Sequence, residues 1–344
     1  MEGLNKYILD KCKELNIDIC GFTDPSPLEY LRDYLIYRKK NNIKTEFEEI
    51  DLDRRIDPKL TLPSCNSIIV LGISYNVDYD EKPEYRLKGR LSKSSWGIDY
   101  HIVLKKKIEL LIEEIKRVRQ FEYKYFVDTG PLIDRELAKK AGIGYYGKNC
   151  SIINDDYGSF IFLGYILTDL ELDFSAPVEE KCGDCKLCID ACPTNALEEP
   201  YRLNSKKCIS YLTQTKDDIP ILLREKMGIK IYGCDTCQLV CPKNEGVIKS
   251  TKEEFMQFMT KGYINIEEIL SMSNKEFKNK YGDMAGSWRG KNILKRNATI
   301  ALGNMKKIDN ISLLIPLLKD SNSMIREYGE WAVVNIFLTS LSNK

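Results

Sequence analysis

The spacing of the cysteines is the feature that most constrains this chain of 344 residues. Cys182, Cys185, Cys188 and Cys192 are separated by two, two and three residues, and Pro193 follows the last of them. Bacterial ferredoxins have this spacing, in which three thiolates of a run hold one 4Fe-4S cluster and the fourth crosses to a second cluster. The run therefore predicts a module whose core is held together by inorganic clusters.

A second set of cysteines completes the requirement for two clusters. It consists of Cys208, Cys234, Cys237 and Cys241, and Pro242 follows the last. Crossed ligation assigns one cluster to Cys182, Cys185, Cys188 and Cys241, and the other to Cys192, Cys208, Cys234 and Cys237. A pair of zinc sites is the alternative, because Cys-x2-Cys pairs also suit tetrahedral zinc. The full register with its proline favours clusters.

The remaining four cysteines lie in or beside apolar segments, and we expect them to pack in the core: Cys12, Cys20, Cys65 and Cys150. Disulfides are disfavoured because the opening residues are charged throughout and lack the apolar core of an export signal. No stretch reaches the roughly 18 to 20 apolar residues that a membrane span needs. These features predict a cytoplasmic protein without a membrane partner.

The pattern of apolar residues predicts an α+β multidomain fold. Over residues 1–172, apolar positions at helical spacing alternate with short β-branched runs, which indicates an α/β domain. The expected helices are residues 3–16, 100–120 and 133–141, and the expected strands are residues 67–71, 125–127 and 160–167. Residues 173–250 have little periodicity and form the expected ferredoxin-like module. Residues 251–344 are helical again, and 291–304 with 311–338 resemble HEAT-like repeats.

Charge is distributed unevenly along the chain. Residues 278–344 contain eleven Lys or Arg and five Asp or Glu, although the whole chain is nearly neutral. Four of these basic residues lie close together, at Arg289, Lys291, Lys295 and Arg296. Such a face permits an anionic partner, and the alternative is an ordinary solvated helix surface.

Two glycine-rich or acidic segments upstream of the clusters are candidates for a reaction centre. Asp134 lies in the first turn of an expected helix, where a carboxylate commonly stabilises the helix N-terminus. The loop that follows, AGIGYYGKN, has three glycines that would let the backbone approach a bulky ligand. His101, the sole histidine, is expected to be a packed or capping residue instead of a ligand.

Several segments together resemble the epoxyqueuosine reductase family over nearly the whole chain. They are DTGPLIDRELA, AGIGYYGKN, GSFIFLGYILTDL, the double cluster run and RNATIALGN. The resemblance implies the last step of queuosine synthesis in tRNA, in which the epoxide oxygen of epoxyqueuosine at the wobble position leaves as water. It also implies two 4Fe-4S clusters and a cobalamin. The resemblance further implies three regions, which are an N-terminal cobalamin domain, a ferredoxin-like module and a helical region that binds tRNA.

The resemblance also implies roles for individual residues. Asp134 becomes the proton donor and a cobalamin neighbour. Further cobalamin contacts are expected at Arg55, Lys148, Gly158, Ser159, Thr168, Asp169, Ser210 and Gln214. The tRNA backbone is expected at Arg289, Lys291, Lys295 and Arg296. An external flavodoxin or ferredoxin would supply electrons, and the protein would be a monomer.

Two other functions fit parts of this pattern. A reductive dehalogenase uses the same pair of cofactors on a small organohalide, but the basic C-terminal region would then lack a purpose. A non-catalytic electron carrier would need only the two clusters. The α/β region of about 170 residues ahead of the clusters disfavours a mere carrier.

Overall fold

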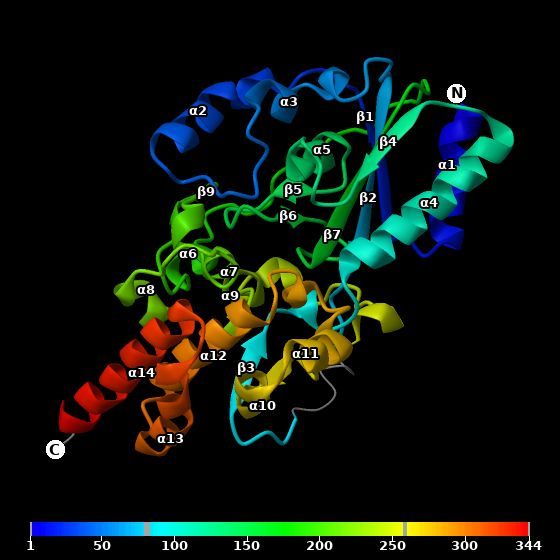
Figure 1. Cartoon of the computed structure of the whole chain (residues 1–344). Coiled ribbons are helices and arrows are strands. Elements are labelled where there is room, and N and C mark those ends of the chain that lie inside the picture. The colour runs from blue at the N-terminus through cyan, green and yellow to red at the C-terminus, as the bar shows by residue number, and fades with distance from the viewer. Residues whose placement is uncertain (1, 79–82, 257–259, 343–344) are drawn as a thin grey trace.

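The computed structural model describes residues 2–78, 83–256 and 260–342 (Figure 1). Its α-helices are α1 (Glu2–Glu14), α2 (Arg32–Lys40), α3 (Leu52–Ile56), α4 (Tyr100–Val118), α5 (Asp134–Lys140), α6 (Leu187–Asp190), α7 (Ile209–Leu212), α8 (Ile221–Lys226), α9 (Thr236–Leu239), α10 (Ile266–Ser271), α11 (Asn274–Tyr281), α12 (Lys291–Met305), α13 (Ile311–Leu314) and α14 (Ser323–Ser342). Its strands are β1 (Ile19–Thr23), β2 (Ser67–Ser74), β3 (Lys88–Leu91), β4 (Tyr123–Phe126), β5 (Tyr145–Tyr146), β6 (Ile152–Ile153), β7 (Ile161–Thr168), β8 (Leu197–Glu199), β9 (Arg202–Leu203), β10 (Lys230–Tyr232) and β11 (Tyr263–Asn265). Within these ranges, no helix is both long enough and apolar enough to cross a bilayer.

A four-stranded sheet in the order β1-β2-β7-β4 organises the N-terminal half. Every helix and strand predicted there from periodicity is present. All three strand pairings are antiparallel, however, so the region is α+β and the predicted α/β arrangement is wrong. Periodicity identifies strands but not their directions, because the pattern of a buried strand is the same in parallel and antiparallel sheets.

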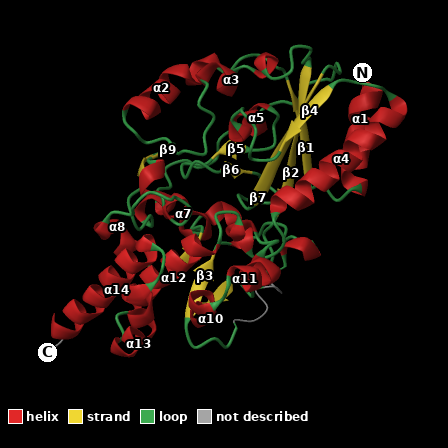
Figure 2. Ribbon diagram, in the orientation of Figure 1, coloured by secondary structure: helices red, strands yellow, loops and turns green. Residues whose placement is uncertain are grey.

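The two faces of this sheet are covered by different helices. Successive side chains of a strand point to opposite faces, and β2 alternates accordingly. Ile69 and Leu71 pack in the core that includes α4, whereas Ile68 and Val70 pack in a second core with Leu137 of α5. Figure 2 shows α1 and α4 on one side of the sheet and α5 on the other. Asp134, the first residue of α5, therefore lies on the α5 face.

A smaller sheet joins segments that are far apart in the sequence. In the order β10-β3-β11, β3 pairs in parallel with β10 and antiparallel with β11. These strands come from the three regions predicted as separate domains. Contacts therefore cross the expected boundaries after residues 172 and 250, and the boundaries themselves stay a prediction.

The C-terminal region is helical, as the sequence predicts. Helices α12 and α14 pack together, and the short α13 lies beside them (Figure 1). Residues 311–338 contain two helices separated by a turn at 319–322, in agreement with the helix pair predicted there: α13 is followed by a short 3-10 helix (Ile315–Lys319), and α14 begins at Ser323. The relation of these helices to HEAT repeats stays a prediction.

Arg296 is not available to nucleic acid, which corrects one of the predicted tRNA contacts. Its side chain is fully buried in α12, where Nη1 donates to the Thr215 carbonyl at 2.7 Å and Nη2 to the Leu212 carbonyl at 2.8 Å. The adjacent Asn297 donates to the Thr213 carbonyl at 2.8 Å. The two side chains thus attach residues 212–215 to α12. Helical spacing placed Arg296 on a basic face, but it could not show that another segment covers that face.

We predict that Arg296→Ala destabilises the protein. The substitution leaves buried carbonyls without donors and opens a cavity, so we expect a loss of roughly 2–4 kcal/mol in the free energy of unfolding. Thermal unfolding of the reconstituted protein measures the effect. Arg119→Ala is the control, because Arg119 is exposed at the end of α4. Equal unfolding temperatures for the two variants would contradict the assignment.

Candidate functional site

One cavity brings together the four cysteines that crossed ligation assigns to the first cluster. Its walls include Cys182, Cys185, Cys188 and Cys241. The first three come from the loop around α6, and Cys241 follows α9. Helices α6 and α9 are in contact, which brings the two runs of cysteines together. The arrangement fits a cluster that is held by thiolates from both runs.

The other four cysteines lie close to one another. Burial raises the pKa of Cys237, and the thiols of Cys208, Cys234 and Cys192 add to this effect, as does Cys188 of the first group. Burial also raises the pKa of Cys208 to about 11, and Cys234 and Cys192 are again neighbours. This grouping is the predicted second set.

Lys148 lies at the first cavity. Its buried Nζ donates to the Gly183 carbonyl and, at 3.1 Å, to the Cys185 carbonyl. Lys148 also lines the cavity with the cysteines. This ammonium group holds the loop that carries Cys182 and Cys185, and the expected contact between Lys148 and cobalamin stays a prediction.

Asp134 is an unpaired acid. The residue as a whole is half-buried, but its Oδ1 is shielded from solvent and has no hydrogen-bond partner. Burial raises its pKa from 3.8 to about 8, and the nearby negative charge of Asp128 adds to this effect. Arg135 and Arg55 act in the opposite direction but do not cancel it. The carboxyl is consequently protonated at neutral pH and can donate a proton.

Asp128 connects Asp134 with the start of α4. The Tyr100 hydroxyl donates to Asp128 Oδ2 at 2.6 Å. His101 faces the same carboxylate at 3.9 Å, while its Nδ1 lies 2.8 Å from the helix-capping carboxylate of Asp99. His101 is thus engaged at a helix start, in agreement with the capping or packing role predicted for it.

Arg55 lies on the other side of Asp134. Its Nη2 forms an ion pair with Glu48 Oε2 at 3.1 Å, and Glu48 also pairs with Arg38 at 2.7 Å. The buried Nε atoms of Arg55 and Arg38 have no hydrogen-bond partner. Buried polar atoms normally find a partner, so this cluster has bonding capacity for a polar ligand.

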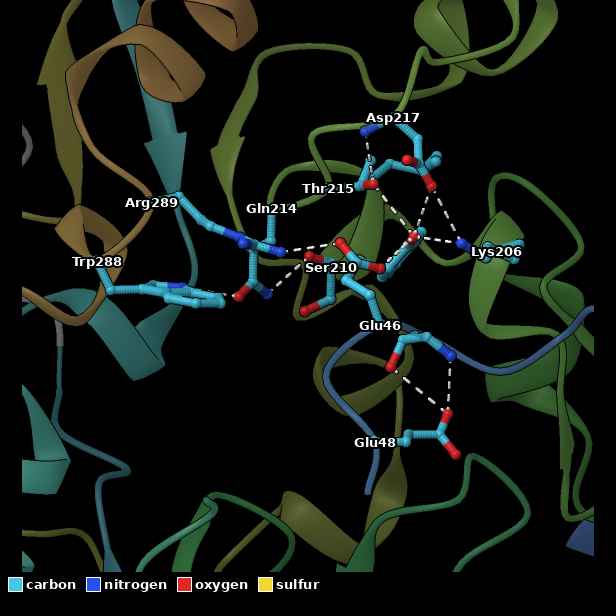
Figure 3. A network of polar contacts seen from close by, with 12 residues as sticks. Glu46, Glu48, Lys206, Ser210, Gln214, Thr215, Asp217, Trp288 and Arg289 are labelled. Carbon is cyan, nitrogen blue, oxygen red and sulfur yellow. Dashed lines mark hydrogen bonds and ion pairs between the residues drawn. The ribbon is translucent and has the colours of Figure 1, made fainter. Parts of the chain in front are cut away.

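Ser210 and Gln214 lie next to the second group of cysteines, just after Cys208. The Gln214 amide donates to the Ser210 carbonyl at 2.9 Å, and its Oε1 accepts from Trp288 Nε1 at 3.1 Å and from the Tyr232 hydroxyl at 3.3 Å. Figure 3 shows Gln214 between Ser210 and Trp288. Burial raises the pKa of the Tyr232 hydroxyl, and the nearby charges of Asp99 and Asp128 add to this effect. The segment after Cys208 is therefore continuous with the surroundings of Asp134.

Four expected cobalamin contacts lie at opposite ends of β7. Gly158 and Ser159 precede the strand and are buried, and Ser159 N donates to Asn244 of the cluster region at 2.7 Å. Thr168 is fully buried at the other end, and Asp169 accepts from Glu122 N at 2.9 Å. The strand between them spans eight residues, or roughly 25 Å. The structure therefore does not bring the two pairs together, and Thr168 has no surface for a ligand.

The other predicted tRNA contacts already have partners within the chain. Arg289 pairs with Glu46 at 2.8 Å, and Lys295 pairs with Asp320 at 2.7 Å. Lys291 Nζ donates to the Met272 carbonyl at 2.9 Å. The four basic residues thus do not form one free basic face.

Sequence reasoning missed several residues around Asp134. Asp128 stands in the quoted DTGPLIDRELA segment, so its acidity could have been considered there. Arg38, Glu46 and Glu48 come from a polar stretch without a motif, and only the fold brings them to the site.

Two family models match parts of the chain. One, described as "4Fe-4S double cluster binding domain", matches residues 181–244 and so contains both runs of cysteines. The other, described as "Epoxyqueuosine reductase QueG, DUF1730", matches residues 55–129.

Individual relatives match nearly the whole chain. The epoxyqueuosine reductase of Bacillus cereus is 41% identical over 342 residues, covering 97% of this chain and 90% of the relative. A crystal structure of epoxyqueuosine reductase with an epoxyqueuosine-modified tRNA-Tyr stem loop has a TM-score of 0.94 at 38% identity and covers 97% of this chain and 90% of that one. The Bacillus subtilis enzyme, solved with its Asp134 catalytic loop swung out of the active site, has a TM-score of 0.91 at 37% identity, with coverage of 97% and 91%.

Iron content tests the two groups of cysteines. We expect Cys241→Ala to retain about four of the roughly eight iron atoms that two 4Fe-4S clusters contain, because only one cavity loses a ligand. Iron analysis after anaerobic reconstitution measures this. Cys150→Ala is the matched control, since Cys150 is buried beside Cys188 but belongs to neither group. A full iron complement in the Cys241 variant would show that the ligand set is wrong.

Proposed function

Because this chain belongs to the epoxyqueuosine reductase family, we propose that it reduces epoxyqueuosine at the wobble position of tRNA with Asp134 as the proton donor. The chain is an oxidoreductase that carries two 4Fe-4S clusters. Family membership excludes the two alternative functions, which were a reductive dehalogenase and a non-catalytic electron carrier. The catalytic loop of the Bacillus subtilis relative also carries an Asp134.

The state of the Asp134 carboxyl is the observation that carries this proposal. An epoxide that becomes an alkene takes up two electrons and two protons, and its oxygen leaves as water. A proton must reach the departing oxygen, and an acid with a pKa of about 8 is protonated at neutral pH yet gives up its proton readily. A carboxylate that only stabilised the N-terminus of α5 would be ionised. The unpaired Oδ1 supports the role of a donor instead.

The side chains around Asp134 fit a large polar cofactor such as cobalamin. The unpartnered Nε of Arg55 and the polar edge of Ser210 and Gln214 would hold it, between Asp134 and the second group of cysteines. Cobalamin supplies a cobalt centre that exchanges single electrons. Asp134 and its neighbours orient the substrate oxygen and hold the proton at the carboxyl.

The two cysteine groups suggest an order for electron entry. Lys186 and Leu187, between ligands of the first group, are exposed, whereas the second group leads through Cys208 to Ser210 and Gln214. Electrons from an external flavodoxin or ferredoxin would enter at the first cluster and leave from the second. The relative bound to a tRNA stem loop supports tRNA as the substrate here. A cytoplasmic monomer is part of the same proposal.

We expect Asp134→Asn to lower turnover at least about a hundredfold, since an amide cannot replace a general acid. Both clusters should remain, because Asp134 is not among the cysteine groups. The assay follows queuosine formation in tRNA, and the absorption spectrum reports the clusters. Asp10→Asn, on the exposed side of α1, is the control. Near-normal turnover of the Asp134 variant would remove this residue from the mechanism.

The pKa of Asp134 also predicts two dependences on pH. Turnover should fall as pH rises through about 8, because the donor then loses its proton.

In the unfolded chain this carboxyl ionises near its usual pKa of 3.8, whereas the folded protein keeps the proton up to about pH 8. The unfolded state therefore binds fewer protons in this interval, and stability falls as pH rises. The free energy of unfolding of the wild type should therefore fall, relative to that of Asp134→Asn, as the pH rises from about 4 to about 8. If the two proteins show the same dependence of unfolding free energy on pH, the raised pKa is wrong.

A further inference from the structure

Two exposed aromatic rings flank an arginine at the junction of the N-terminal and C-terminal regions. The Arg289 guanidinium lies 4.6 Å from the centre of the Phe47 ring and 4.2 Å from that of Trp288. The rings are 5.4 Å apart, yet Trp288 is 53% exposed and Phe47 is 42% exposed. We call these three residues the aromatic rim. Large aromatic side chains contribute most when they are buried, so their shared exposure indicates a surface for a partner.

Contacts from three parts of the chain hold the aromatic rim in place. Trp288 Nε1 donates to Gln214 at 3.1 Å, and Phe47 packs against Tyr211 with ring centres 5.7 Å apart. Arg289 pairs with Glu46 at 2.8 Å (Figure 3). The surface is therefore organised before any partner binds, which reduces the entropy that binding would cost.

The aromatic rim is continuous with the surroundings of Asp134. Glu46, Phe47 and Glu48 are consecutive, and they connect two sets of partners. Glu46 contacts Arg289, while Glu48 pairs with Arg55, whose charge acts on Asp134. Residues 46–48 thus link the rim to Arg55, whose charge acts on Asp134.

Charge around the rim argues against a phosphate site. Arg289 is paired with Glu46, and its side chain is only 13% exposed, so its charge is not free to bind a phosphate. The rings of Trp288 and Phe47 remain exposed, whereas the Arg289 guanidinium is largely buried between them. Unpaired bases of RNA loops bind by stacking on such aromatic and guanidinium planes.

We propose that Trp288, Arg289 and Phe47 form a stacking surface for an unpaired base of the anticodon loop, next to the base that is reduced. This inference rests on the proposed function, because it takes tRNA as the substrate. It assigns Arg289 to holding the two stacking rings in place, instead of the phosphate contact that the sequence predicted. Recognition at this point is consequently weakly dependent on salt.

Binding of an unmodified anticodon stem loop to the reconstituted protein tests the surface without turnover. We expect Trp288→Ala and Phe47→Ala each to weaken binding about tenfold, whereas Trp288→Phe keeps most of the affinity because a ring remains. The slope of affinity against salt should not change, since no phosphate contact is lost. Phe174→Ala is the control, because Phe174 is 53% exposed and lies outside the rim.

The outcomes separate this inference from the proposed function. Wild-type RNA affinity in both alanine variants would overturn the stacking surface and leave the role of Asp134 untouched. A reduced salt slope would overturn it in favour of a phosphate contact. Loss of corrin absorbance in Trp288→Ala with RNA affinity unchanged would assign the rim to the cofactor. Weaker binding with unchanged salt slope and unchanged iron-sulfur and corrin spectra supports the proposal.

Discussion

The attachment of residues 212–215 to helix α12 by Arg296 and Asn297 is the interaction on which the site most depends. A fully buried guanidinium is costly to desolvate, and burial lowers its pKa to about 10. The cost is offset by hydrogen bonds to carbonyls that would otherwise be unsatisfied. As a result, the segment between Cys208 and Gln214 is fixed to the C-terminal helices. A cluster ligand and the proposed substrate surface thus share one rigid support.

Buried charges near Asp134 are compensated by ion pairs, whereas Asp134 itself avoids a charge by keeping its proton. Arg55 and Arg38 share Glu48, so their charges are compensated within the protein. Asp134 has no such partner at Oδ1 and stays protonated, because desolvation and Asp128 outweigh the attraction of Arg135 and Arg55. An ion pair with Arg55 would lower the pKa of the acid and remove its proton at neutral pH. The Arg55–Glu48 pair therefore helps to keep Asp134 protonated.

Local patterns in the sequence predicted the helices, the strands and the cysteine groups. They could not predict contacts between segments that are distant in the chain. The cysteine spacing identified both thiol groups, because loop geometry allows only three ligands of a run on one cluster. The helices and strands of the N-terminal half followed from periodicity. Three features could not be predicted from periodicity: the antiparallel pairing, the sheet that joins β3 to β10 and β11, and the burial of Arg296. Each of them depends on segments that are distant in the chain. The basic residues near 290 show the same limit, as their partners Glu46, Met272 and Asp320 lie in other segments.

The sequence by itself determined that this protein carries two clusters and an acid in the IDREL segment, because cluster ligation and helix starts depend on neighbours in the chain. Only the tertiary structure decided that the acid is unpaired and protonated, and which basic residues are exposed. A pKa depends on desolvation and on charges within a few ångströms, and those are set by folding. The same holds for the aromatic rim, in which Phe47 is more than 200 residues away from Trp288 and Arg289 in the sequence.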